Sequence, residues 1–76
     1  MVIAFVLCVA QAGKERTVME KLIKLKEVDE AHVVYGEYDV IGKIKLDNLK
    51  RLDTFIVDEI RSIAEVQVTS TMISSE

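Results

Sequence analysis

The first ten residues contain the feature that most limits how this chain can fold. Every residue from Val2 to Ala10 is apolar, and the run ends shortly before Gly13. A short run rich in Val, Leu and Phe predicts a β-strand rather than a helix. An antiparallel strand with one solvated side normally alternates apolar and polar residues. Because both sides of this strand are apolar, we expect both of its faces to be covered.

The next part of the chain changes from helical to extended periodicity. Within residues 14–26 the apolar residues recur three and four apart, which predicts a helix. Val28 and the stretch 31–35 return to β-rich composition and predict a second strand. Residues 36–38 predict a turn, and residues 39–46 predict a third strand that forms a hairpin with the second.

A second helix and a fourth strand complete the pattern. Asp47 and Asn48 are good N-cap residues and precede apolar residues at helical spacing as far as Ile63. Residues 66–74 alternate and predict a strand. The order β-α-β-β-α-β predicts a ferredoxin-like α+β fold, a four-stranded antiparallel sheet with two helices on one face. We expect a single domain over residues 1–76.

The helix-free face of this sheet predicts association between copies. Four to six apolar side chains left in water cost roughly 6 to 18 kcal/mol, at roughly 1.5 to 3 kcal/mol each. This is comparable to the whole stability of a small domain, about 5 to 15 kcal/mol. Packing two such sheets face to face in a two-fold dimer removes the cost. We therefore predict a homodimer formed through the open sheet face.

Charge and composition exclude several classes of protein. A net charge of −3 and a pI near 5.1 argue against direct nucleic-acid binding. We expect a cytoplasmic protein, because no apolar run has the length of a membrane span and the opening segment lacks the features of a signal peptide. One cysteine, Cys8, and one histidine, His32, supply neither a metal site nor a Cys–His nucleophile with its third group. We expect no enzyme activity, no metal and no cofactor, and we expect Cys8 to be a buried apolar residue.

Two motifs resemble a known family. The stretch Gly36-Glu37-Tyr38-Asp39, which follows AHVVY, resembles the G-x-Y-D turn of the RAM domain. This is the regulation-of-amino-acid-metabolism module of the Lrp/AsnC transcription regulators. The stretch VQVTSTMI, residues 66–73, is similar to the final strand V-x-x-T-x-T-x-I of that family, and the opening AFVLCVA also fits. The resemblance spans essentially the whole chain and keeps its element order.

The resemblance implies an assembly and a ligand. It implies that the ferredoxin-like fold forms a dimeric α/β barrel and that dimers assemble into a larger ring, for example an octamer or a decamer. It also implies that amino-acid effectors bind at interfaces between dimers. Members usually carry an N-terminal helix-turn-helix DNA reader, whereas this chain begins at its first strand. We expect a stand-alone RAM domain with an indirect role in transcription, with full-length Lrp/AsnC paralogues as partners.

Five residues are candidates for effector binding: Gly36, Tyr38, Asp39, Thr69 and Thr71. Glycine accepts the positive φ that a hairpin turn needs, and it also lets backbone amides approach a ligand carboxylate. Asp39 either closes the turn by bonding neighbouring amides or pairs with the α-ammonium group of an amino acid. Tyr38 either packs in the turn or supplies an apolar wall with a polar tip. The two threonines either reflect β-propensity alone or hydrogen-bond a small polar ligand.

Two other functions fit the same fold. One is a small dimeric enzyme resembling the α/β-barrel monooxygenases, for which His32 is the sole candidate acid–base residue or haem ligand. The other is a ligand-free assembly partner of DNA-binding paralogues. The fold alone does not separate these functions, because it hosts many.

Overall fold

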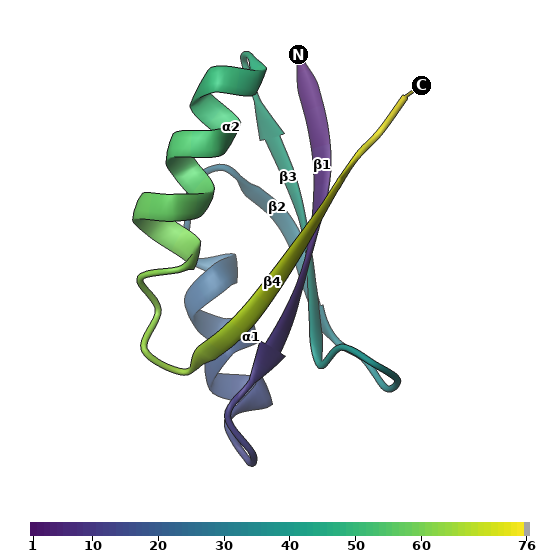
Figure 1. The fold of residues 1–76 in the computed structure, drawn as a ribbon, viewed down its shortest axis with the longest axis vertical. Coiled ribbons are helices and arrows are strands. Elements are labelled where there is room, and N and C mark those ends of the chain that lie inside the picture. Colours follow the sequence, from purple (N-terminus) through teal and green to yellow (C-terminus); the bar gives the residue numbers. More distant parts are fainter. Residues whose placement is uncertain (76) are drawn as a thin grey trace.

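The computed structural model describes residues 1–75. Its elements are β1 (Val2–Ala10), α1 (Glu15–Ile23), β2 (Val28–Val33), β3 (Val40–Leu46), α2 (Leu49–Phe55), the π-helix η1 (Ile56–Ile60) and β4 (Val66–Ile73). The strands form one antiparallel sheet in the order β2-β3-β1-β4. Both helices cover the same face of this sheet (Figure 1). The predicted ferredoxin-like fold is therefore confirmed.

The observed elements differ from the predicted ones at their ends. The predicted helix over 14–26 is shorter, Glu15–Ile23, because the chain leaves the helix in a tight turn in which Leu25 N donates to Leu22 O at 3.0 Å. The second strand ends at Val33 rather than at residue 35, and the third begins at Val40 rather than at 39. The hairpin therefore has a longer connection than the predicted three-residue turn.

The second helix begins as predicted and ends in an unexpected form. Asn48 is the N-cap, since its Oδ1 accepts a hydrogen bond from Arg51 N at 2.9 Å. After Phe55 the helix widens into η1, where Arg61 N donates to Ile56 O, five residues earlier, at 2.8 Å. Such wide turns are rare and occur often at functional sites.

β1 lies in the middle of the molecule and has two different apolar faces. Its even positions from Ala4 to Ala10 are buried beneath the helices, and Ala4, Val6 and Cys8 are fully buried. Its odd positions stay half-exposed on the side that carries no helix. The other buried side chains lie on α1, α2, η1, β2 and β3. They are Val18, Leu22, Val28, Val40, Ile44, Leu46, Leu52, Phe55 and Ile60.

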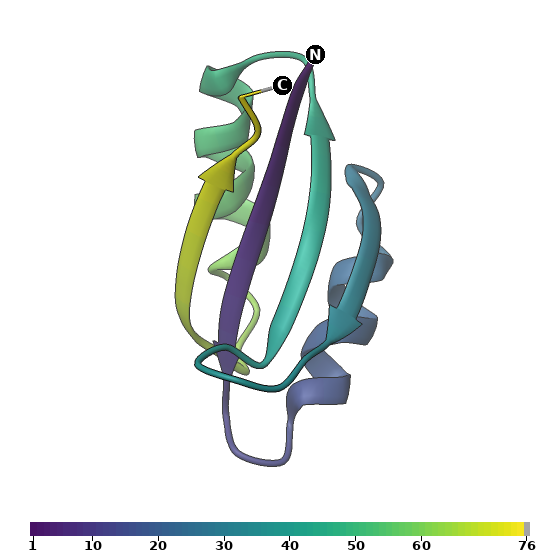
Figure 2. The same ribbon diagram turned by 90° about the vertical axis from the view of Figure 1, so that its right-hand side faces the viewer.

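The helix-free side of the sheet faces the viewer in Figure 2, and the strand register places on it an apolar band that is interrupted by Ser70 and bordered by Lys43 and Lys45. The strand register places Met72, Ser70 and Val68 of β4 opposite Phe5, Leu7 and Val9 of β1, and places Ile41 of β3 opposite Leu7. Residues directly opposite each other project from the same face of a sheet. We call this surface the open face, defined by Ile3, Phe5, Leu7, Val9, Ile41, Val68 and Met72. Val68 and Met72 are 54% and 55% exposed.

Cys8 is buried, as predicted, and this makes stability depend on pH. Burial raises the pKa of its thiol from the ordinary 9.0 to about 11. The unfolded chain therefore releases the thiol proton first, so stability that is present below about pH 9 is lost as the pH rises towards 11.

We predict that the free energy of unfolding falls between these pH values by about 2 to 3 kcal/mol more in the wild type than in Cys8→Ala. Urea denaturation at a series of pH values measures both slopes at one protein concentration. Parallel curves for the two proteins would contradict this prediction.

Candidate functional site

The connection between β2 and β3 contains the motif G-x-Y-D. It runs over residues 34–39 and is closed by Val34 N, which donates to Asp39 O at 2.8 Å. Gly36 has a φ of +137°, a conformation that side-chain-bearing residues rarely adopt, although a Cβ there would meet no atom within 4 Å. Backbone conformation, rather than crowding, therefore favours glycine at this position.

Asp39 ties this connection to β1 by two hydrogen bonds. Its backbone N donates to Cys8 O at 2.9 Å, and its Oδ2 accepts from Ala10 N at 2.9 Å. The carboxylate of Asp39 thus bonds an amide 29 residues away in the sequence, rather than an amide of its own turn. One carboxylate oxygen is therefore already engaged in fixing the turn.

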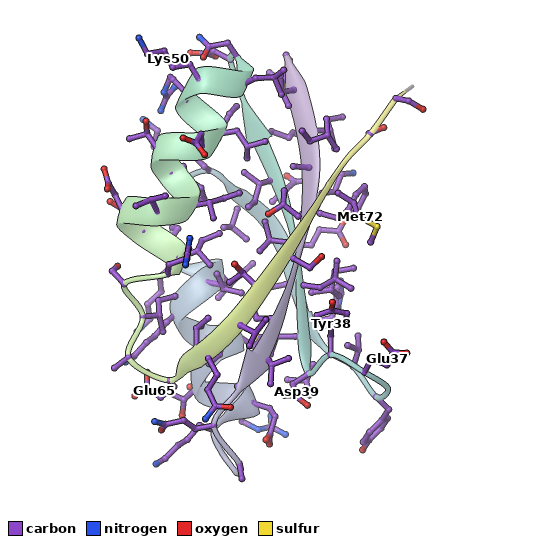
Figure 3. All side chains as sticks on the ribbon, in the orientation of Figure 1. Glu37, Tyr38, Asp39, Lys50, Glu65 and Met72 are labelled. Carbon is purple, nitrogen blue, oxygen red and sulfur yellow. The ribbon has the colours of Figure 1, made fainter. Side chains whose placement is uncertain are left out.

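Tyr38 is half-buried and lies on the same side of the sheet as Met72 (Figure 3). The connection as a whole extends away from the helical layer, to the right in Figure 1. Gly36, Tyr38 and Asp39 therefore form one group at the side of the open face.

Thr69 and Thr71 lie on the other face of the sheet. They are opposite Cys8 and Val6, whose side chains point towards the helices. The helices leave this part of β4 uncovered, and a groove of about 470 Å³ lies between α2 and β4. Its lining residues are Leu49, Leu52, Asp53, Ile56, Arg61, Thr69, Thr71 and Ile73.

The groove combines apolar walls with one acid, one base and two hydroxyl groups. Within residues 1–75, the side chains of Asp53 and Arg61 have no ion-pair partner. A carboxylate and a guanidinium group can pair with the ammonium and carboxylate groups of an amino acid. A second hollow of about 360 Å³ continues along β4, and Arg61 and Thr69 line both.

Sequence reasoning missed Asp53 and Arg61. A signal for Asp53 was present, because Leu49, Leu52, Asp53 and Ile56 have the spacing of one helix face. No such signal was present for Arg61, because it follows a wide turn that the sequence did not predict.

The five predicted residues thus form two separate groups in one chain. The turn residues lie at the side of the open face, and the threonines line a groove on the helix side. One chain does not enclose a ligand between the two groups.

His32, the candidate of the enzyme alternative, lies exposed on β2. Its Nε2 is 3.1 Å from Glu30 Oε1, and the hollow beside it has a volume of about 60 Å³. Ligand pockets usually have about 300 to 1,000 Å³. The part of the chain that the structure describes holds no cluster of metal-ligating side chains, and none of its helices has the length and apolarity to cross a membrane.

Comparison with known proteins identifies the family. Residues 3–76 match the model of the Lrp/AsnC ligand binding domain. The chain belongs to this family. The HTH-type transcriptional regulator FL11 of Pyrococcus furiosus is 39% identical over 72 residues, which cover 95% of this chain and 47% of that protein. The chain therefore spans about half the length of the curated relatives it matches, and its relatives are transcriptional regulators.

Solved structures agree with this assignment. FFRP-DM1 is 61% identical, with a TM-score of 0.93, and the match covers 97% of this chain and 99% of that one. Escherichia coli AsnC is 28% identical, with a TM-score of 0.92, and the match covers 99% of this chain and 51% of that one.

A more distant likeness concerns the fold alone. The Neisseria meningitidis transcriptional regulator NMB0573, solved as a complex with L-Met, is 19% identical with a TM-score of 0.87. The match covers 99% of this chain and 50% of that one.

The hydrogen bonds of Asp39 predict a structural effect that needs no ligand. In Asp39→Ala the part-buried amide of Ala10 loses its acceptor, so we expect the free energy of unfolding to fall by about 1 to 3 kcal/mol. Asp39→Asn retains an acceptor oxygen and serves as the control, with a smaller loss. Urea denaturation without amino acids measures both, and an Asp39→Ala protein as stable as the wild type would contradict the prediction.

Proposed function

We propose that this chain is an amino-acid effector-binding and oligomerisation domain that acts indirectly in transcriptional regulation. The observation that carries the proposal is the open face, an apolar surface without cover in one chain. The family model, which is that of a ligand binding domain, supports the ligand-binding part.

The open face fits a second copy of the chain. Its β1 residues stay half-exposed and its β4 residues Val68 and Met72 more than half-exposed. Two sheets packed face to face bury such surfaces in a layer about 10 Å thick. A two-fold axis brings identical patches together, so the face is its own partner. The resulting dimer is the α/β barrel of the family, and larger rings such as octamers or decamers are built from it.

An amino acid fits the polar groups of the two candidate sites. Asp53 and Arg61 carry the charges complementary to an amino acid, and Leu49, Ile56 and Ile73 provide apolar contacts for a side chain. A regulator of the same fold forms a complex with L-Met. We place the effector between copies, where Gly36, Tyr38 and Asp39 of one copy meet Thr69 and Thr71 of another.

The role in transcription is indirect. The relatives are helix-turn-helix regulators about twice as long as the matched region. We propose that this chain assembles with such full-length paralogues, so that effector binding here changes their assembly. It makes no contact with nucleic acid of its own, in keeping with its net charge of −3.

Effector binding is tested by calorimetric titration with the twenty amino acids. We expect at least one to bind, and Thr69→Val and Thr71→Val each to weaken it about fivefold through loss of a hydrogen bond of about 1 kcal/mol. Thr17→Val, on α1 away from the groove, is the control and keeps the affinity. A folded protein that binds none of the twenty ends this part of the proposal.

Dimerisation is tested by a charge on the open face. Phe5→Glu places a carboxylate in the proposed interface, and we expect it to convert the dimer into a folded monomer in sedimentation equilibrium. Val57→Lys changes an equally apolar residue, 51% exposed, on the helical side, and is expected to leave the mass unchanged. A wild-type chain that is monomeric at micromolar concentration contradicts the proposed assembly.

A further inference from the structure

The connection between β2 and β3 is longer than a hairpin requires. Two residues suffice for a tight hairpin turn, whereas six, residues 34–39, connect these strands. Figures 1 and 2 show that this segment leaves the sheet and projects outward on the side of the open face. We call residues 35–38 the arm.

The base of the arm is fixed by hydrogen bonds. Val34 and Asp39 close it at 2.8 Å, and Asp39 is bonded to Cys8 and Ala10 at the end of β1. The direction of the arm is therefore set by the central strand. Because its base is held in place, the arm loses less conformational entropy on binding a partner than a connection without such bonds would lose.

The arm presents an aromatic side chain to water next to its base. Tyr35 is 103% exposed, more than any other large apolar or aromatic residue in the described part of the chain. Tyrosine is enriched in the cores of protein interfaces, and such residues often carry much of the binding energy. A fully exposed tyrosine on a fixed arm is therefore suited to contact a partner rather than its own domain.

The position and reach of the arm suit a contact with a second copy of the chain. Tyr35 follows the base residue Val34 directly, so the backbone carries it at most about 3.5 Å from the base, and its long side chain adds to this reach. Two sheets packed face to face are about 10 Å apart. Because the arm projects on the side of the open face, the side chain of Tyr35 can contact a second sheet packed on that face.

We propose that in the dimer the arm of each copy packs against the second copy, with Tyr35 as the anchor of this contact. The inference rests on the proposed dimer and adds to it a contact outside the two sheets. Two-fold symmetry produces the contact twice, once from each arm.

Substitution of Tyr35 tests the contact. We expect Tyr35→Ser to raise the dissociation constant of the dimer about tenfold for each of the two contacts, about 100-fold in all. Tyr35→Phe retains the ring and is expected to stay near the wild type. Val57→Ser, at a half-exposed residue on the helical side, is the matched control. Sedimentation equilibrium over a dilution series measures all four constants.

Tyrosine fluorescence gives a second readout that does not depend on affinity. The chain has no Trp and two Tyr, so Tyr35 is the only emitting residue in Tyr38→Phe. We expect acrylamide to quench it less in the dimer than in the monomer obtained by adding Phe5→Glu.

The outcomes distinguish a failure of the arm contact from a failure of the proposed dimer. A dimer that Tyr35→Ser leaves unchanged, or a Tyr35 that is quenched equally in both states, overturns the arm contact and leaves the dimer in place. A wild-type chain that never dimerises overturns both.

Discussion

The structure depends on the central strand β1, which is hydrogen-bonded to β3 on one side and β4 on the other. Its even side chains fill the space beneath the helices, and its odd side chains form the middle of the open face. Because this strand is apolar on both sides, one of its faces completes the core, and the other leaves apolar side chains partly exposed to solvent. The same nine residues therefore contribute both to the core and to the open face.

The candidate sites are also positioned by β1. The turn with the G-x-Y-D motif is held by hydrogen bonds to Cys8 and Ala10. Thr69 of β4 pairs with Cys8 of β1 in the sheet. A change at the end of β1 therefore displaces both groups of proposed effector contacts. Because the two groups lie on different faces of the sheet, one chain does not bring them together.

Much of this could be predicted from the sequence because the signals are local. The alternation in β4, the cap at Asn48 and the apolar run of β1 each depend on neighbouring residues. The partner of the Asp39 carboxylate could not be predicted, because it is 29 residues away and chosen by strand register. The direction of the 34–39 connection and the place of Arg61 beside the groove depend likewise on the arrangement of distant elements, whereas the position of Asp53 on the helix face could have been predicted. The family motifs therefore indicated a binding domain but not how its residues are arranged.

The wide turn η1 determines where the positive charge of Arg61 lies relative to the groove. One additional residue per turn rotates everything that follows by about 100° relative to a regular α-helix. The apolar stripe of Leu49, Leu52 and Ile56 ends at the first residue of η1, and Arg61 follows η1, yet all of them border one groove. The guanidinium group thus owes its place beside β4 to a backbone hydrogen-bond pattern. A homologue with one residue fewer between 56 and 60 would keep the apolar stripe, but the residue that corresponds to Arg61 would point away from the groove.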